Sequence, residues 1–522
     1  MTKSLIFFLI SAFLFFPLIA ILQDNALLRT EIATKDYNFL YFIPVEQSGV
    51  ISVQHLTKFN GSNDSWEFHV YSNTLHHILS KDFNVGSGHK LIEYHDDGDS
   101  FIYCFFAEDG GSRKYEILKF NYKNGDISKY SASGDRLTSF QNYDVLGNAT
   151  FVAGIQNPSS FQYLGQAIFT LTLVPIIWGT KIYNLKPHIF YSNIVSNKSL
   201  DIVPILKGES EILCTKNNNL KNTYAIIIKT LKGRKTNLNY FEYDESGKEI
   251  KSSHLTLLNE KNIISGQLIV NRDSNFTFVG TYNQNNRRRS NLANSATGIF
   301  VSSLKNGNEE YVKFHPFADF KNAKLGLNFR DRKKFENSKR NGEKIDLDFK
   351  LLLHKDIINI DSVHILLAES FFPEYHYETF NNFYGSMYSN QVFDGYRFTS
   401  AITAAFDDNG DLLWDNIFEI NNIISYSLDE NVIVYYDGIT QVMLYYLDGK
   451  IYSKVIKGND ILYRKEATEV STVNNDEKVL LENYGKIYHW YGQYFLLTGF
   501  QIVLNKMGEK RKVYFLLKLK FD

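Results

Sequence analysis

The fold of this chain is decided by the stretch Asp394-Gly-Tyr-Arg-Phe-Thr-Ser-Ala-Ile-Thr-Ala-Ala-Phe-Asp-Asp-Asn-Gly-Asp-Leu-Leu-Trp-Asp-Asn-Ile-Phe-Glu-Ile420. Over residues 396–406 the character of the side chains alternates from one residue to the next, and many of them are β-forming. Both features favour a strand. The next four residues, 407–410, are typical of a tight turn, because Gly410 tolerates the positive φ that such turns require. Residues 412–420 are apolar again and include Trp414. The stretch therefore predicts a β-hairpin.

The same two-strand unit recurs along the whole chain, and seven copies can be recognised. The shorter strand of each copy is expected at 100–107, 149–154, 211–215, 275–281, 362–369, 431–436 and 493–499. The longer strand is expected at 114–122, 165–174, 223–231, 297–304, 399–406, 441–447 and 512–521. An eighth copy is the alternative, because the first hundred residues hold further strand-like runs at 37–43, 51–59 and 66–71.

This repetition predicts an all-β fold, a β-propeller of seven or eight four-stranded blades. Units of about 60 residues suit a propeller, because a single blade cannot bury both of its faces and stacking blades in a ring covers them. We expect the N-terminal strands to complete the last blade and close the ring. A pair of β-sandwiches is the main alternative. No segment with a convincing helical period interrupts the body of the chain, which disfavours α/β folds.

Composition and charge limit the classes of function. The chain has 522 residues, of which 44% are hydrophobic and 15% aromatic, enough for a large core. Its net charge is −1, so neither nucleic acid nor an anionic membrane surface is expected as a partner. Cys104 and Cys214 lie in strand-like runs of different units, and we expect two buried free thiols. No cysteine spacing of the metal-binding kind is present, and no metal or cofactor is predicted.

Residues 1–22 have the pattern of a targeting segment. Lys3 gives a basic start, residues 5–22 form an apolar run with Pro17 inside it, and Ala20 offers a small residue for cleavage. We expect a secretory signal peptide, followed by one propeller domain over residues 26–522. An uncleaved membrane anchor is the alternative, because about 18 apolar residues nearly span a bilayer. In either case the protein is expected to be exported to the periplasm, the cell surface or the medium.

Two segments break the repeat and are expected to form an irregular insertion around residues 314–397. Residues 314–350 include a basic stretch at 328–340 that is expected to be partly helical. Residues 371–397 are rich in Phe and Tyr and are expected to form a long loop. Long loops in compact folds are usually functional or disordered, and the aromatic one is too apolar to be simply disordered.

The aromatic insertion is the best candidate for a ligand-binding site. Rings of Tyr and Phe stack on sugar rings or apolar side chains, and Tyr adds a hydroxyl for specificity. The candidate binding residues are Tyr375, His376, Tyr377, Tyr384, Tyr388, Tyr396 and Arg397. The competing interpretation is that these aromatic side chains pack the insertion onto the rim of the propeller.

Other polar patterns are more typical of turns and solvated loops than of sites. Residues 287–289 are three consecutive arginines that could bind an anionic group. Two groups of aspartates could bind Ca²⁺ but lack the EF-hand spacing, Asp96, Asp97 and Asp99 in one and Asp407, Asp408 and Asp411 in the other. The histidines are scattered, and the chain has no G-x-S-x-G elbow, P-loop or dinucleotide fingerprint. No catalytic residue is assigned.

The repeated strand–glycine turn–strand unit, clearest at 398–414, 240–250 and 120–127, resembles the β-propeller superfamily. The resemblance covers roughly residues 30–522 and is to the uncharacterised secreted propellers of many bacteria. The chain has no repeated Trp-Asp pair of the WD40 kind, no repeated Gly-Gly pair of the kelch kind and no sialidase-type Asp-box. The resemblance therefore implies an architecture and no functional residues.

Three functions remain open from the sequence. The leading one is a non-catalytic binding or scaffold module, with a polysaccharide or an envelope protein as partner. The second is an extracellular carbohydrate-active hydrolase or lyase, with carboxylates such as Glu369, Glu374 or Asp394 near the aromatic insertion. The third is an envelope component tethered to the membrane by an uncleaved segment 5–22.

Overall fold

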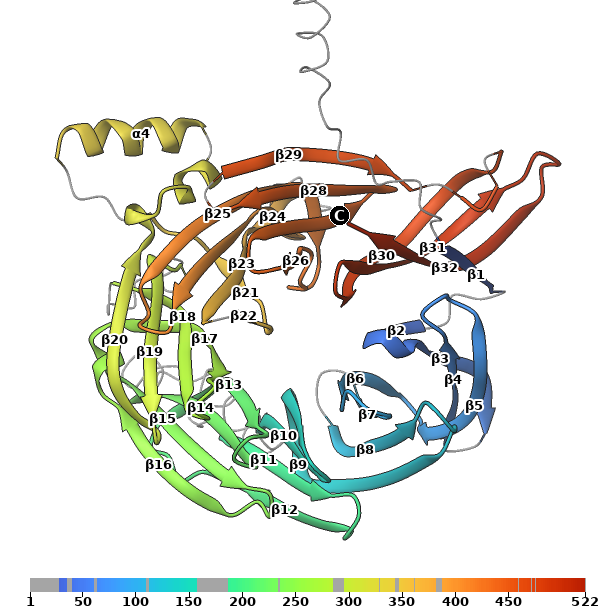
Figure 1. Ribbon diagram of the computed structural model, residues 1–522, viewed down its shortest axis with the longest axis horizontal. Helices are drawn as coiled ribbons and strands as arrows, with labels where there is room; N and C mark the ends of the chain where they lie inside the picture. Colours follow the sequence, from blue (N-terminus) through green and yellow to red (C-terminus); the bar gives the residue numbers. More distant parts are fainter. Residues whose placement is uncertain are drawn as a thin grey trace, which may run out of the picture.

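The chain forms a ring of antiparallel sheets around a central opening (Figure 1). This nearly all-β, propeller-like architecture confirms the predicted fold class. The computed structural model describes residues 28–34, 40–60, 63–108, 112–156, 186–232, 235–284, 295–327, 329–342, 347–360, 362–381, 387–458, 460–470, 472–474 and 476–521.

Four of the sheets described contain four strands that follow one another in sequence. The first holds β2 (Leu40–Val45), β3 (Gly49–Asn60), β4 (Asn63–Tyr71) and β5 (His77–Gly86). The second holds β13 (Glu209–Asn218), β14 (Thr223–Lys232), β15 (Lys235–Asp244) and β16 (Glu249–Leu255). The third holds β17 (Asn262–Val270), β18 (Phe276–Asn283), β19 (Gly298–Lys305) and β20 (Asn308–Pro316). The fourth holds β26 (Ile433–Tyr436), β27 (Thr440–Leu447), β28 (Lys450–Lys457) and β29 (Asp460–Glu469).

A seven-stranded sheet joins two such units through one long strand. It contains β6 (His89–Asp96), β7 (Phe101–Glu108), β8 (Ser112–Asn121), β9 (Ile127–Leu146), β10 (Ala149–Gln156), β11 (Pro187–Asn193) and β12 (Lys198–Ile202). The start of β9 pairs with β8, and its end pairs with β10. The described residues form seven sheets, and dividing this sheet within β9 would give eight units.

The first and last strands of the described chain close the ring. β1 (Leu28–Ala33) pairs with β32 (Lys510–Lys520), beside β31 (Tyr494–Leu504) and β30 (Lys478–Tyr491). This pairing confirms that an N-terminal strand completes the last sheet. Only β1 does so, because β2 is the first strand of the next sheet.

Charged side chains reinforce this closure. Arg29 lies 2.8 Å from Glu31 on the same strand, and its guanidinium stacks 4.6 Å from the ring centre of Phe515. Arg511 of β32 pairs with Glu31 and, at 2.8 Å, with Glu477. The last sheet therefore holds the first strand by side-chain contacts as well as by the backbone ladder.

Hydrophobic side chains fill the spaces between neighbouring sheets. Phe68 of β4 stacks on Phe120 of β8 with ring centres 4.2 Å apart, and Trp66 meets Phe106 at 5.3 Å. Sheets stacked in this way bury the apolar face that each would otherwise expose to water. Cys104 is buried among the same residues, and Cys214 is buried in another cluster; both are free thiols, as expected.

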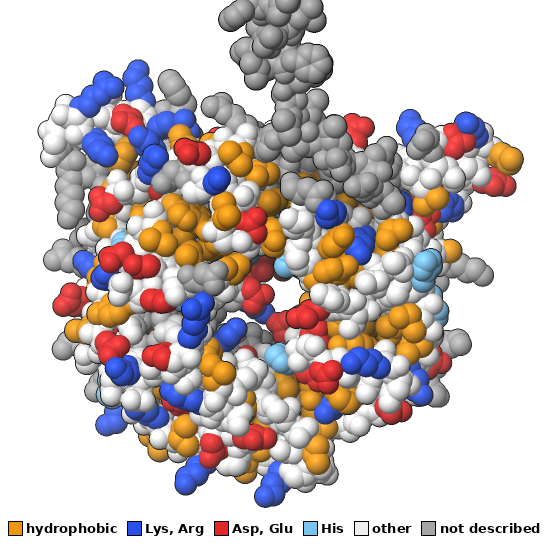
Figure 2. Space-filling view, viewed as in Figure 1, with side chains coloured by type: hydrophobic (Ala, Val, Ile, Leu, Met, Phe, Trp, Pro, Cys, Tyr) orange, Lys and Arg blue, Asp and Glu red, His pale blue; other side chains and the backbone are white. Residues whose placement is uncertain are grey.

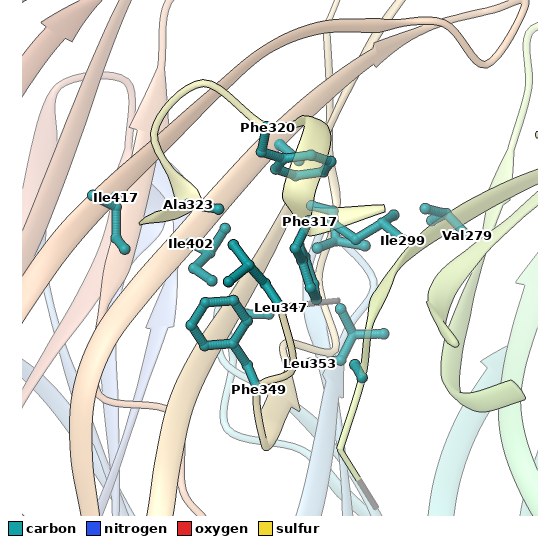
Figure 3. Packing of buried hydrophobic residues seen from close by; sticks show 14 of the residues in the cluster. Val279, Ile299, Phe317, Phe320, Ala323, Leu347, Phe349, Leu353, Ile402 and Ile417 are labelled. Carbon is teal, nitrogen blue, oxygen red and sulfur yellow. The ribbon is translucent and has the colours of Figure 1, made fainter. Parts of the chain in front are cut away.

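The insertion lies within and beside the sheet of β21 (Leu351–Leu353), β22 (Ile358–Ile360), β23 (Val363–Asn381), β24 (Met387–Asp407) and β25 (Leu412–Ser425). The basic stretch forms helix α4 (Phe329–Arg340), outside the ring in Figure 1, which confirms the expected helical part. Phe317 and Phe349 pack with ring centres 5.3 Å apart, in one cluster with Ile299 of β19 and Ile402 of β24 (Figure 3). The insertion therefore fills the space between two neighbouring sheets.

The targeting segment at residues 1–22 lies outside the described residues, so the signal peptide and its alternative, the membrane anchor, stay predictions. Within the described part of the chain, no helix combines the length and apolar character needed to span a membrane.

Candidate functional site

The aromatic insertion is a β-ribbon and not a loop. Strands β23 and β24 continue past the body of their sheet and pair from Phe371↔Phe398 to Asn381↔Met387. β25 follows β24 only as far as Tyr396↔Ser425, so the outer part of the hairpin has two strands. We call residues 371–381 and 387–398 the ribbon. The expectation of a loop is therefore wrong, because the alternation of aromatic and polar residues here is a strand pattern.

One side of the ribbon carries a row of aromatic rings. The ring centres of Tyr375 and Phe393 are 5.4 Å apart, and those of Phe393 and Tyr396 are 5.0 Å apart. Tyr377 lies two residues beyond Tyr375 on the same strand, and Tyr426 lies 6.4 Å from Phe393. These five residues form the aromatic face. The three ring pairs around Phe393 are edge-to-face or tilted, the geometries that aromatic pairs prefer.

The aromatic face is anchored at its base and open at its outer end. Tyr396 packs against Phe371 at 5.5 Å, and both border the core cluster between this sheet and the β26–β29 sheet. Farther out, Tyr375 is 46% exposed and Tyr377 is 70% exposed, while Tyr426 beside the ribbon is 78% exposed. Among the described residues of the ribbon, the exposed ones beside these rings on this side are uncharged, namely Thr379, Ser389 and Gln391. The aromatic face is therefore an apolar surface that packs against the core at its base and has hydroxyl and amide groups beside it.

The other side of the ribbon is charged. His376 Nδ1 lies 2.5 Å from a carboxylate oxygen of Asp394, and its Nε2 lies 3.3 Å from Glu378. The hydrogen bond to Asp394, followed by the one to Glu378, raises the pKa of His376 above its ordinary value. Arg397 forms a two-pronged ion pair with Glu374, with N–O distances of 2.7 and 3.0 Å. These ion pairs lie beside the bulge between Glu374 and Tyr375, where the register of the two strands shifts.

The structure divides the predicted binding residues between the two sides. Tyr375, Tyr377 and Tyr396 share the aromatic face, whereas His376 and Arg397 lie on the charged side in ion pairs. Tyr388 pairs with Phe380 in the backbone register, but its side chain is outside the described part. Tyr384 lies outside the described residues.

The sequence prediction missed two members of the aromatic face, Phe393 and Tyr426. The signal for Phe393 was its place in an alternating run. Tyr426 follows the end of β25, and only the spatial neighbourhood of that strand brings it to the ribbon.

The carboxylates considered for catalysis are each engaged elsewhere. Glu369 is fully buried and accepts hydrogen bonds from the backbone N–H groups of Asn431 and Val432 at 2.7 and 2.8 Å. It also lies 2.8 Å from His354 Nε2. Glu374 and Asp394 are held by Arg397 and His376, as described above. These carboxylates therefore organise the backbone and the ribbon.

The remaining sequence patterns serve local structure. Asp97 accepts hydrogen bonds from three backbone N–H groups of its own turn, at 2.9 to 3.0 Å. Asp407 does the same for Asn409 and Asp411, at 3.0 and 2.8 Å. No group of three or more His, Cys, Asp or Glu side chains in the described part is arranged to hold a metal ion. The arginines at 287–289 lie outside the described residues.

Comparison with known proteins gives structural neighbours alone. No family model and no curated protein matches the chain. The polysaccharide lyase Uly1 aligns with a TM-score of 0.36 and 9% identity, over 84% of this chain and 90% of its own. Prolyl oligopeptidase B from Galerina marginata aligns with a TM-score of 0.37 and 8% identity, over 91% of this chain and 56% of its own. The apocarotenoid oxygenase of Synechocystis aligns with a TM-score of 0.29 and 7% identity, over 51% of this chain and 58% of its own.

This chain therefore spans little more than half the length of the peptidase and the oxygenase. The lyase and the peptidase have β-propeller-like folds. With TM-scores below 0.5, none of these likenesses carries an inference about activity.

Proposed function

We propose that this protein is a non-catalytic binding module, and that the aromatic face of the ribbon holds a neutral polysaccharide. The observation that carries this proposal is the anchored row of exposed rings bordered by uncharged polar side chains. Tyrosine supplies a large and rigid contact area at a low cost in conformational entropy, and its hydroxyl hydrogen-bonds at the same time. Sugar rings present both the C–H surface and the hydroxyl groups that match such a face.

The spacing along the strand suits a polymer. Tyr375 and Tyr377 are two residues apart on one strand, so their Cα atoms are separated by about 7 Å along the ribbon. A chain of sugars lying along the ribbon would meet successive rings. An anionic polymer is less well matched, because the charged groups described on the ribbon lie on the opposite side.

We also propose that the protein acts outside the cytoplasm, where such polymers occur. The support for export is the basic start and apolar run of residues 1–22. Membrane tethering by an uncleaved segment is the alternative, and mass spectrometry of the exported protein distinguishes the two.

The test is co-sedimentation of the full chain with insoluble neutral polysaccharides and with peptidoglycan, assaying the supernatant for newly released sugar ends. Removing both rings in Tyr375→Ala/Tyr377→Ala should weaken binding about tenfold or more, because each aromatic contact contributes about 0.5–1.5 kcal/mol. The matched control is Tyr484→Ala on β30, whose side chain is 74% exposed and away from the ribbon. Equal binding by both variants would contradict the proposal.

The same tubes test the alternative of a carbohydrate-active enzyme. Released reducing ends would indicate a hydrolase, and released ends that absorb in the ultraviolet because of a new double bond would indicate a lyase. Either result would replace the binding-module proposal with an enzymatic one.

A further inference from the structure

A lysine crosses the central opening of the ring. Lys355 lies between β21 and β22, and its Nζ is 2.5 Å from a carboxylate oxygen of Glu93 on β6. The sheets that carry β6 and β21 lie on opposite sides of the opening (Figure 1). The two residues are 262 positions apart in sequence, so the contact exists only because the ring is closed.

Further charged groups from other strands gather around this pair. Glu430 accepts a hydrogen bond from the backbone N–H of Lys355 at 2.7 Å. Burial opposes protonation of Lys355, but Glu93, Glu430 and Asp356 outweigh it and raise the pKa of the ammonium group. Asp144 of β9 interacts electrostatically with both members of the pair and with Lys216 of β13. We call these groups the axial cluster: Glu93, Asp144, Lys216, Lys355, Asp356 and Glu430.

The axial cluster is surrounded by the sheets of the ring, but its side chains remain in contact with water. Lys355 keeps 60% of its side chain exposed and Glu93 keeps 33%. Figure 2 shows a hollow at the centre of the ring with acidic, basic and histidine side chains at its edge. An ion pair in contact with water contributes about 0–1 kcal/mol, so a competing ion can displace Lys355 at little cost.

The chemistry of the cluster selects a cation. Lys355 contacts two carboxyl groups directly, those of Glu93 and Glu430, and Glu430 also lies 3.6 Å from His354 Nδ1. The carboxyl groups of Asp144 and Asp356 lie farther away and act on Lys355 through their electrostatic field. These groups are not arranged to hold a metal ion, and neither is any other set in the described part of the chain. The hydroxyl of Tyr143 interacts electrostatically with Asp144 and Glu93, is buried and has no hydrogen-bond partner among the described residues. An organic cation that donates N–H bonds fits such a site better than a compact metal ion does.

We propose that the axial cluster is a second binding site, for a ligand that carries a primary ammonium group, and that Lys355 occupies this site until the ligand displaces it. The Lys355 ammonium already makes the contact with Glu93 that the ligand's ammonium would make. A ligand larger than one ammonium group would also contact the walls of the channel. The site is separate from the ribbon and does not depend on the proposed polysaccharide binding.

The probe is n-butylammonium, with tetramethylammonium at equal ionic strength as the control cation that cannot donate hydrogen bonds. Binding to the full chain is measured by isothermal titration calorimetry. We expect wild type to bind n-butylammonium weakly and Lys355→Met to bind it at least tenfold more tightly, because the resident ammonium is gone. Glu93→Gln should lose at least tenfold in either background, because the carboxylate is replaced by a neutral amide.

The matched control is Lys123→Met, which removes a lysine of similar exposure from a surface pair with Asp99 and should bind like wild type. Equal binding of tetramethylammonium would overturn the proposal, as would Lys355→Met binding no more tightly than wild type. Binding by Lys355→Met alone would also overturn it, because Lys355 would then be a permanent link across the ring. If Lys355→Met does not fold, Lys355→Gln provides the same comparison.

Discussion

Gly395 is the residue that lets β25 pass close to the base of the ribbon. Its φ is +131°, and an added Cβ would lie 2.9 Å from both the carbonyl oxygen of Ser425 and a methyl group of Ile424. A side chain here would meet both a strained backbone and a steric clash. The direction of the ribbon therefore depends on the absence of a side chain at this position.

Gly395→Ala should destabilise the protein by about 2–4 kcal/mol, from backbone strain and overpacking together. The control is Gly438→Ala, where φ is +95° but an added Cβ meets nothing within 4 Å, so only the strain remains. Urea denaturation of both variants separates the two contributions. Equal losses would show that the contact with β25 contributes nothing.

Glu369 is the buried carboxyl group on which the turn before β26 depends. Glu369→Ala would leave the N–H groups of Asn431 and Val432 buried without an acceptor, and we expect a loss of about 3–5 kcal/mol. The control is Glu374→Ala, which breaks a partly exposed ion pair and should cost about 1 kcal/mol or less. The free energy of unfolding of each variant checks the order, and a reversed order would contradict this role.

At the scale of elements, we expect the stability of the ribbon to depend on pH through the ion pairs on its charged side. Hydrogen bonds to Asp394 and then to Glu378 raise the pKa of His376 above its ordinary value of 6.5. A raised pKa means that the protonated form stabilises the folded ribbon. This stabilisation is complete below pH 6.5 and is lost as the pH rises through the raised pKa.

An NMR titration of the His376 ring should therefore give a pKa above 6.5, and Asp394→Asn should lower it. Amide exchange in the ribbon, corrected for the intrinsic effect of pH, should quicken over the same range in wild type. In His376→Gln that pH dependence should be absent. A ribbon equally protected on both sides of the transition would contradict the coupling.

The sequence predicted hairpins better than it predicted the ribbon, for a physical reason. Residues 396–420 combine alternation with a glycine turn, and β24 and β25 meet around that turn as expected. Residues 371–381 alternate as well, but they break the two-strand repeat, and this break suggested a long loop. The assignment of side chains to faces depended on the bulge between Glu374 and Tyr375, which no local pattern reveals.

At the scale of the whole molecule, the stability of the ring depends on β1. Deleting residues 28–33 removes a strand and the partner of Arg511, and we expect a loss of about 5 kcal/mol from several ladder hydrogen bonds of about 1 kcal/mol each. Guanidinium denaturation measures this loss. Arg511→Met, which keeps the ladder, should cost much less, and an unchanged midpoint for the deletion would contradict closure by β1.

The features that the sequence could not supply are those that join distant parts of the chain. β9 carries one strand through two units without a turn, so its sheet can be counted as one blade or as two. Glu93 and Lys355 belong to different repeats, and neither has a local pattern that suggests a partner. Such contacts depend on how the closed ring places distant strands, and no local pattern predicts them. The ring itself could be predicted, because its repeated unit is visible in the local sequence.

The pairing of β1 with β32 has a consequence for synthesis. Glu31 and its partner Arg511 are 480 residues apart, so at about 5–20 residues per second the ribosome makes the second about 25–100 s after the first. During that time β1 has no partner strand, because the other strands of its sheet, β30, β31 and β32, are the last of the described chain to be made. An unpaired strand of this kind invites pairing with other chains. The protein therefore stays open to pairing with other chains through β1 until β32 has been made.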